Sequence, residues 1–495
     1  MKIAGLTAAF VVFAVLATAN AGGYRFGISD QSYYAVAVAA DAHPGFFPRD
    51  TPLLDAQSRL MLSDDLLGWI VRRTGLDLPP VFFALYVVTL VALFTASIVF
   101  ARRLGLSWWA VAAALLLLTL KHHIAKTGAN TLEGYAHVRV LAFALGVAAM
   151  ACAIGRRPGV ALVWLTLSAV LHVTTAAWFA LALAIGGVWT RPAWRRRMAL
   201  AAIPGAALLI WGCTLGPLAG RFQVMDAAWV AALQDRDYLF PAGWPAYAWV
   251  LNMAYPAVVL AIVARRARRG LLVPGEATVV IGLFGLVALF LLSLPFSAAH
   301  VVLAVQLQVN RVFWLTDFAT TIYLGWWLMD GLGAAAERAT AFTVLGVLLA
   351  ISGARGVYLV RMDAHRPLVQ IGLPATPWTD AMAWLRRQPS NWHVLADPRH
   401  AWKYGVSVRL AAEKDTLLEA GKDPALGTYD RDVAMRVADR LAALAGFDRF
   451  DSGDIRRLAA RYDLDVLVAE AGRTFDFPVL YRNAGFTIYD LRWHP

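Results

Sequence analysis

The sequence predicts a polytopic α-helical membrane protein with about eleven spans, followed by a small C-terminal α/β domain. The chain has 495 residues, of which 59% are hydrophobic and only 16% are charged, whereas soluble proteins carry roughly 25% charged residues. Many apolar stretches reach the roughly 17 residues that are needed to cross a bilayer core. The net charge of +12 would indicate a nucleic-acid partner for a soluble protein, but in a membrane protein it records topology.

The first apolar segment covers residues 1–20 and fits either a cleaved signal peptide or a retained signal anchor. Its end, Ala19-Asn20-Ala21, has the small residues of a cleavage site. We expect retention, because the many spans that follow need a first helix to pack against.

The remaining spans are predicted from apolar runs that alternate with groups of arginine. Because cytoplasmic loops carry an excess of Lys and Arg, every arginine group should lie inside. Arginines flank both ends of 160–190, so we expect a hairpin of two short segments that breaks near His172. One long tilted helix is the alternative. The expected spans are 82–101, 107–120, 138–155, 160–190, 198–218, 246–264, 277–295, 310–329 and 339–354.

This topology divides the chain into a transmembrane domain, 1–360, and an extracytoplasmic α/β domain, 361–495. It places the N-terminus in the cytoplasm and the C-terminus outside, as in a multi-pass protein of the bacterial inner membrane. Most of the positive charge then falls in the inferred cytoplasmic parts and gives no indication of nucleic acid. The predicted outer parts are the large first loop 21–81, then 121–137, 219–245, 296–309 and the chain after about residue 355.

The C-terminal domain is predicted from short segments of mixed periodicity. We expect helices that begin at Thr376-Pro377, at Asp430 and at Ser452, where serine would be the cap. Strands are expected at 393–396 and 465–468, and a hairpin at 479–481 and 486–489.

The first outer loop contains two acids that are candidates for chemistry. Asp30 follows the first span closely and should lie near the membrane surface. A carboxylate at that position could act as a general base toward a hydroxyl group, or bind a divalent cation that holds a lipid phosphate. Asp50 follows at loop distance as a second acid. Alternatively, Asp30 caps a helix that begins at Gln31, and a long solvated loop carries several acids in any case.

Four further residues are candidates because of where they lie relative to the predicted membrane. Arg139 stands at the outer end of a span and could bind phosphate, and Glu133 precedes it in the second outer loop. His172 is an ionisable residue at membrane depth, which is a functional hypothesis by default, although a buried histidine bound to a backbone carbonyl is the alternative. Arg311 enters a span from outside and could bind an anionic headgroup or pair with Asp317.

The layout of these features resembles the GT-C superfamily of integral membrane glycosyltransferases, in particular bacterial members whose soluble domain comes last. The resemblance covers the whole chain in layout, and in motif it is specific around Asp30, because the family places a catalytic acid in the first outer loop. It implies that Asp30 is the catalytic base or binds Mg²⁺ or Mn²⁺, with Asp50 or Glu133 as the second acid. Arg139, His172 and Arg311 would then face the donor phosphate. Family members often show paired acids, whereas Asp30 is followed by Gln31.

The expected function is transfer of a sugar from a polyprenyl-phosphate donor to an envelope glycan, lipid or protein at the extracytoplasmic face. Two other classes stay open. A transporter subunit for lipids or glycans is one, although the internal repeats of many secondary transporters are not visible. A non-catalytic envelope-assembly protein is the other.

Overall fold

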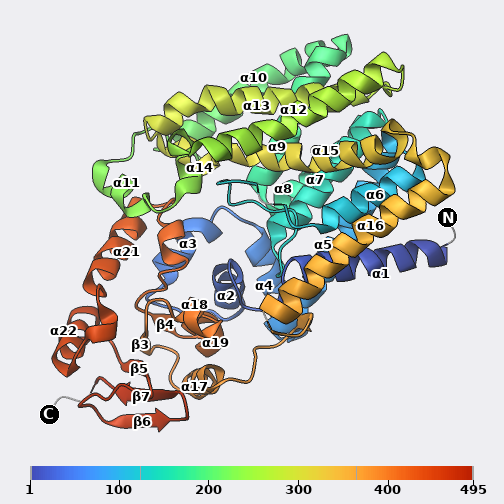
Figure 1. The fold of residues 1–495 in the computed structure, drawn as a ribbon. Coiled ribbons are helices and arrows are strands. Elements are labelled where there is room, and N and C mark those ends of the chain that lie inside the picture. The colour runs from blue at the N-terminus through green and yellow to red at the C-terminus, as the bar shows by residue number, and fades with distance from the viewer. Residues whose placement is uncertain (1–2, 123, 364, 493–495) are drawn as a thin grey trace. The chain divides into compact units, whose positions relative to one another are not determined.

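The computed structural model describes residues 3–122, 124–363 and 365–492. The chain forms two compact units, each built from several chain segments (Figure 1). Unit 1 comprises Met1–Tyr24, Leu85–Met225 and Arg236–Val369, and unit 2 comprises Arg25–Ala84, Asp226–Asp235 and Gln370–Pro495. Most of the first outer loop therefore belongs to the same unit as the C-terminal region, which the sequence did not predict.

Unit 1 is a bundle of apolar helices. By length and composition seven of the described helices could cross a membrane, namely α1, α5, α9, α10, α12, α13 and α16 with its continuation η6, and α6, α7 and α8 are apolar but shorter. The chain is thus mostly helical with several potential membrane spans, and the count of eleven stays a prediction. The helices are α1 (Ile3–Asn20), α5 (Leu78–Arg103, whose first residues lie in unit 2), α6 (Trp108–Thr119), α7 (Val138–Ile154), α8 (Pro158–Leu171), α9 (Val173–Thr190), α10 (Pro192–Thr214), η1 (Asp237–Leu239), η2 (Pro241–Gly243), α12 (Ala246–Arg268), α13 (Glu276–Ala298), α14 (Val302–Leu307), η3 (Val309–Arg311), α15 (Val312–Trp326), η4 (Trp327–Gly331), η5 (Ala334–Ala336), α16 (Arg338–Val357) and η6 (Tyr358–Asp363).

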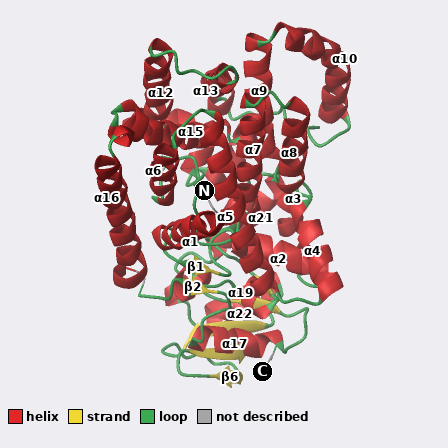
Figure 2. Ribbon diagram, turned by 90° about the vertical axis from the view of Figure 1, so that its right-hand side faces the viewer, coloured by secondary structure: helices red, strands yellow, loops and turns green. Residues whose placement is uncertain are grey.

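The predicted hairpin is present between α8 and α9, which lie side by side (Figure 2). The break falls at His172, whose backbone is extended between the two helices. At the other end of α9, Arg191 donates from Nη2 to the carbonyl oxygen of Ala153, 3.2 Å away. Ala153 is near the end of α7, just before α8 begins, so both flanks of the hairpin lie at one end. A single long helix is therefore excluded.

The arginine-rich turns of unit 1 gather at this same end. Arg266 donates from Nη2 to the carbonyl oxygen of Leu104 at 2.7 Å, which joins the end of α12 to the turn after α5. The guanidinium of Arg103, in that turn, lies 3.0 Å from the position that a Cβ on Gly155 would take. The positive-inside pattern thus corresponds to one physical end of the bundle. We call the opposite end of these helices the outer end, in keeping with the predicted topology.

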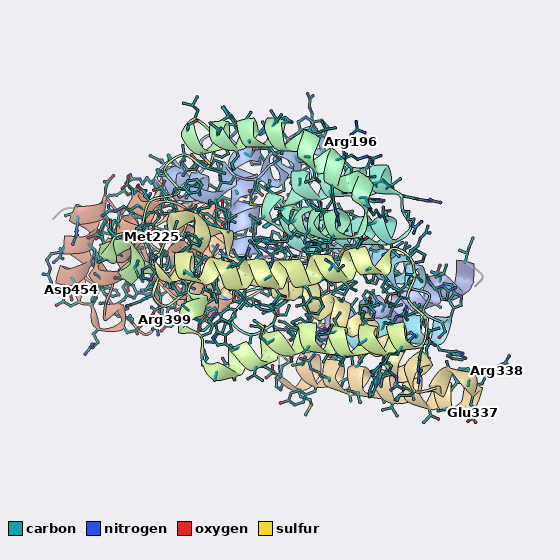
Figure 3. The ribbon with its side chains drawn as sticks, turned by 90° about the horizontal axis from the view of Figure 1, so that it is seen from above. Arg196, Met225, Glu337, Arg338, Arg399 and Asp454 are labelled. Carbon is teal, nitrogen blue, oxygen red and sulfur yellow. The ribbon has the colours of Figure 1, made fainter. Side chains whose placement is uncertain are left out.

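Charged side chains at the arginine-rich end are paired where they are buried. Arg266 and Glu276 form a fully buried ion pair, with Nε 3.0 Å from Oε1 and Nη2 3.1 Å from Oε2. The hydroxyl of Tyr323 donates to the same Oε1 at 2.9 Å. Two neighbouring charged residues at the start of α16, Glu337 and Arg338, are exposed (Figure 3).

Unit 2 contains a five-stranded sheet in the order β4-β3-β5-β7-β6. The strand β3 pairs in parallel with β4 and β5, whereas β5, β7 and β6 are antiparallel neighbours. A separate two-stranded sheet joins β1 and β2, and the boundary between the two units falls inside each of these two strands. The elements are β1 (Tyr24–Arg25), α2 (Gln31–Ala42), α3 (Thr51–Ser58), α4 (Ser63–Thr74), α11 (Ala227–Leu233), β2 (Val369–Gln370), α17 (Pro377–Arg386), β3 (His393–Leu395), α18 (His400–Tyr404), α19 (Val408–Ala412), β4 (Asp415–Thr416), α20 (Asp423–Leu426), α21 (Arg431–Ala443), η7 (Phe447–Arg449), α22 (Ser452–Tyr462), β5 (Val466–Glu470), β6 (Val479–Arg482) and β7 (Phe486–Asp490).

The local predictions for the C-terminal region are confirmed except for one cap. Thr376 caps α17 in a capping box, and Pro377 occupies the first turn, where its missing N–H costs nothing. Ser452 does not cap α22, because Asp451 is the N-cap and its carboxylate accepts from the backbone N–H of Asp454 at 2.8 Å. Aspartate and serine are both good caps, so adjacent candidates compete.

The hairpin geometry makes a topological prediction. In a chain whose two cysteines, Cys152 and Cys213, are replaced by alanine, we expect Val173→Cys to react with a membrane-impermeant maleimide added outside intact cells. Arg157→Cys and Arg195→Cys should react only after the membrane is permeabilised. Reaction of these last two from opposite sides would contradict the hairpin.

Candidate functional site

The candidate site in unit 1 begins with a buried ion pair at the start of α7. Arg139 Nη2 lies 2.6 Å from Glu133 Oε1, and both side chains are less than a tenth exposed. The turn between them is held against the end of α1. A Cβ on Gly134 would lie 2.5 Å from the carbonyl oxygen of Gly23 and 2.9 Å from that of Ala21, so only glycine fits here.

His172 lies at the outer turn of the α8–α9 hairpin. Its Nδ1 is within hydrogen-bond distance of the hydroxyl groups of Thr174 and Thr175, at 3.1 and 3.0 Å, and accepts from the backbone N–H of Thr175. The ring is therefore oriented by neighbouring polar groups, and the backbone of His172 itself provides a further hydrogen bond. His172 also interacts electrostatically with Arg311, His137 and Arg139.

Arg311 is positioned by the short helix η3, which leads into α15. Gln308, just before η3, has a left-handed backbone with a φ of 48°, and its carbonyl accepts from the N–H of Arg311 at 2.9 Å. One turn later, Trp314 stacks on Phe143 with ring centroids 4.1 Å apart, and its indole N–H donates to Thr131 at 2.9 Å. These contacts hold Arg311 against α7 and the second outer loop.

Five side chains thus form one group, which we call the cationic cluster: Glu133, His137, Arg139, His172 and Arg311. All five lie at the outer end, because α7 and α15 run from them toward the arginine-rich turns. Within unit 1 the cluster holds two guanidinium groups and one carboxylate. The predicted alternative for Arg311 is wrong, because Asp317 instead pairs with His122, with Nδ1 3.0 Å from Oδ1.

Asp30 lies in unit 2 at the N-cap position of α2, but its side chain makes no capping hydrogen bond. Its carboxylate instead forms an ion pair with Lys422, and both side chains are about a quarter exposed. The neighbouring Gln31 closes the loop, because its Oε1 accepts from the N–H of Gly27 at 2.8 Å. The carboxylate of Asp30 therefore makes no hydrogen bond to the first turn of α2.

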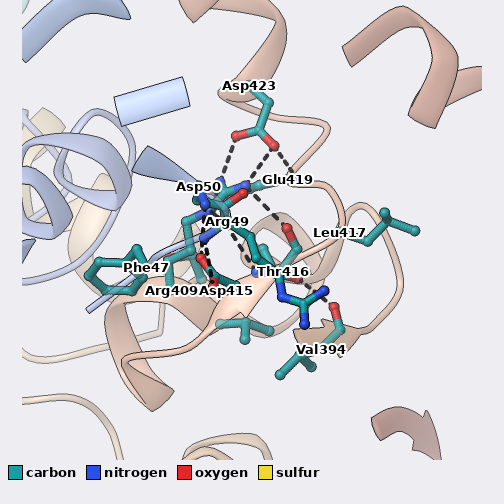
Figure 4. A network of polar contacts seen from close by, with 12 residues as sticks. Phe47, Arg49, Asp50, Val394, Arg409, Asp415, Thr416, Leu417, Glu419 and Asp423 are labelled. Carbon is teal, nitrogen blue, oxygen red and sulfur yellow. Dashed lines mark hydrogen bonds and ion pairs between the residues drawn. The ribbon is translucent and has the colours of Figure 1, made fainter. Parts of the chain in front are cut away.

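Asp50 is the centre of a buried network in unit 2 (Figure 4). Its Oδ2 accepts from Arg409 Nε at 2.7 Å and from the N–H of Thr416 at 3.1 Å. Its Oδ1 accepts from Arg436 at 2.8 Å, and Arg440 lies 3.8 Å away. Burial by itself would raise the pKa of this carboxyl, but the three arginines hold it below its usual value.

The expectation that Asp50 serves as a second catalytic acid does not match this geometry. The side chain is completely buried, and its oxygens are occupied by arginines and by the backbone of β4. Arg409 also binds Asp423, with distances of 2.6 and 2.9 Å. Asp50 is thus the counter-ion that ties the first outer loop to the C-terminal segments of unit 2. Nothing in the local sequence marks Arg409 as its partner.

Two further acids of this network are buried at a cost. Burial, and then the neighbouring Asp50, raise the pKa of Asp415 to about 6. Burial raises the pKa of Glu419 to about 7, although Arg409 opposes the shift. The network therefore contains carboxyls that the fold favours in their protonated form.

The residues within either unit do not form a donor set for the divalent cation that the family resemblance implies. Among the described residues, no group of three or more His, Cys, Asp or Glu side chains is placed to hold a metal ion. Asp30 in particular has an ammonium group as its neighbour. We therefore assign no step to a metal.

Asp50→Asn should destabilise unit 2 by about 3–5 kcal/mol, because it leaves buried arginines without their carboxylate. We expect a lower melting temperature of the full chain in detergent and a lower yield. Asp55→Asn, which changes an exposed acid on the neighbouring helix α3, is the control. Equal stability of the two variants would contradict the structural role.

Glu419→Gln should raise stability at high pH. The folded-state pKa of about 7 lies above the unfolded value of roughly 4.3. The wild-type glutamate therefore does not lower the free energy of unfolding below about pH 4, and lowers it increasingly as the pH rises to about 7. Thermal melts from about pH 5 to about pH 8 should show a shallower decline for the variant. Part of the decline should remain, because Asp415 still titrates. Glu337→Gln, at an exposed position, should leave the wild-type profile unchanged.

Comparison with known proteins gives a likeness in structure but none in sequence. No protein-family model matches the chain, and no curated protein matches it. The chain is similar to the archaeal oligosaccharyltransferase AglB from Archaeoglobus fulgidus, solved in complex with an inhibitory peptide and a dolichol-phosphate. The likeness has 11% sequence identity and a TM-score of 0.49, and it covers 94% of this chain and 69% of that one. Similarity at this level assigns neither a family nor a function.

Proposed function

We propose that this chain is a membrane glycosyltransferase that acts at the extracytoplasmic face of a bacterial inner membrane. The donor is a polyprenyl-phosphate-linked sugar, and the acceptor is an envelope glycan, lipid or protein that offers a hydroxyl group. The observation that carries the proposal is the cationic cluster at the outer end of a bundle of apolar helices.

The cluster supports a phosphate ligand because of its chemistry and its depth. A guanidinium group offers a planar set of N–H donors that matches the oxygens of a phosphate. Arg139 and Arg311 both contribute such a group, and both approach His172 closely enough to interact with its ring. A lipid phosphate lies at the boundary of the hydrocarbon core, which is where helix ends present their side chains.

The reaction needs a base and a stabilised leaving group. In the proposed step, Asp30 accepts the proton of the acceptor hydroxyl while the oxygen of that hydroxyl forms a bond to the anomeric carbon of the sugar. The bond from that carbon to the phosphate oxygen breaks, and the electron pair stays on the lipid phosphate. Arg139 and Arg311 stabilise the negative charge that develops there. Lys422, which pairs with Asp30, positions the carboxylate.

The test compares variants in cells that lack the protein. We expect these cells to accumulate a polyprenyl-phosphate-linked sugar, measured by lipid-resolved mass spectrometry, and the wild-type chain to remove it. Asp30→Asn should not remove it although it reaches the membrane in equal amount, because the carboxylate is partly exposed and makes no capping bond. Asp55→Asn should act as the wild type does.

Kinetics with the accumulated lipid as the donor then separate binding from chemistry. Arg311→Gln should raise the KM for this donor by about tenfold, because the donor phosphate is already charged when it binds, and should also lower kcat, because the charge on the phosphate grows as the bond breaks. Asp30→Asn should lower kcat and leave KM nearly unchanged. Full transfer by Asp30→Asn would remove Asp30 from the mechanism, and the absence of any accumulated lipid-linked sugar would favour a transporter or an assembly protein.

A further inference from the structure

A groove runs along three helices of unit 1 that the proposed reaction does not use. It lies between α1, α6 and α16 and has a volume of about 450 Å³. Its rim is open, since Val12 and Leu349 are 45% and 44% exposed. The lining is apolar apart from one hydroxyl group, and it includes Val12, Phe13, Leu116, Thr119, Gly346 and Leu349.

The groove ends in polar side chains at the outer end of the three helices. Thr119, the last residue of α6, lies 2.7 Å from the hydroxyl of Ser352. Asn20, the last residue of α1, donates to the same hydroxyl at 3.0 Å. At the opposite end Trp109 contacts Phe342, with ring centroids 5.0 Å apart. The three helices therefore run in the same direction, from an aromatic contact to a polar cap.

Arg355 stands directly above this polar cap. Its Nη1 donates to Asn20 Oδ1 at 2.8 Å and to the carbonyl oxygen of Asn20 at 3.2 Å. Both of these acceptors, which the described part of the chain provides, are neutral. The guanidinium charge is thus held beside the polar cap without a direct carboxylate contact among the described residues, and the N–H groups on Nε and Nη2 are donors that an anionic ligand could accept from.

The segment after α16 adds more positive charge at the same place. It contains Arg361 and Arg366 against one acid, Asp363. Arg366 donates from Nε to the carbonyl oxygen of Gly22 at 3.2 Å, which holds the segment beside the end of α1. Arginines at an outer end run against the positive-inside pattern, so a ligand that favours them there explains the exception.

We infer that this groove binds an anionic phospholipid, with one hydrocarbon chain between α1, α6 and α16 and the headgroup phosphate at Arg355. Basic sites between membrane helices recognise anionic headgroups, and the apolar groove ends at Thr119, which is linked through the hydroxyl of Ser352 and the side chain of Asn20 to Arg355. A phospholipid is the occupant because bulk lipid is present at a far higher concentration than any carrier lipid, and binding follows mass action. None of the groove residues or of the arginines at its end belongs to the cationic cluster, and the inference does not rest on the proposed function.

Two variants test the two halves of the site in the full-length chain. A Cβ on Gly346 would meet nothing within 4 Å, so Gly346→Leu can begin a side chain there without strain and occupy part of the groove. Gly205→Leu on α10, where a Cβ also meets nothing within 4 Å, is its matched control. Arg355→Gln removes the headgroup contact, and Arg338→Gln removes the same charge from the other end of the same helix.

The measurement is native mass spectrometry of delipidated protein titrated with phosphatidylglycerol or with phosphatidylcholine. The wild type should bind phosphatidylglycerol about tenfold more tightly than phosphatidylcholine, because both lipids carry the phosphate but only phosphatidylcholine adds a trimethylammonium cation, which the charge of Arg355 repels. Arg355→Gln should lose this preference, Gly346→Leu should lose binding of both lipids, and both controls should match the wild type.

Three results would overturn the inference. One is wild-type binding by Gly346→Leu, and another is an unchanged preference in Arg355→Gln. The third is a polyprenyl phosphate that binds more tightly than phosphatidylglycerol and is lost in Gly346→Leu. Because the readout is lipid binding, it stays independent of whether the chain transfers sugar.

Discussion

A charge that is removed from water must be paired, and the buried ion pairs of this protein follow from that constraint. In unit 1 the buried charges are surrounded by apolar helices. Arg266 and Glu276 are buried only because they bind each other and the hydroxyl of Tyr323. The other arginines of that end sit at helix termini, where side chains reach the surface. The helices between the two ends can consequently be almost entirely apolar.

The same constraint applies in unit 2, where the charged groups are buried in a protein core. Asp50 is completely buried, and the arginines around it come from segments that are far apart in the sequence. One carboxylate therefore joins the first outer loop to the C-terminal sheet and helices. Two acids of the network are less stable in their charged form. Burial raises the pKa of Asp415 to about 6 and that of Glu419 to about 7. Stability and pH sensitivity thus have one origin.

Much of the candidate site in unit 1 could be predicted from the sequence, because topology restricts where a residue can lie. In the sequence, Arg139, His172 and Arg311 are polar residues at the outer ends of apolar runs, and the structure places them in one cluster with Glu133. The same topology puts Asp50 in an outer loop, but its side chain is completely buried against Arg409. An acid in a loop looks the same in the sequence whether it faces solvent or three arginines.

By itself the sequence determined the apolar helices, the hairpin at His172, the gathering of arginines at one end and most elements of the C-terminal sheet. These features depend on local periodicity and on a charge rule that acts on each loop separately. Only the tertiary structure decided that residues 25–84 belong with the C-terminal segments, that Asp50 is buried, and that a basic end closes the groove at Arg355. Each of these depends on contacts between residues far apart in the chain, for which a single sequence carries no local signal.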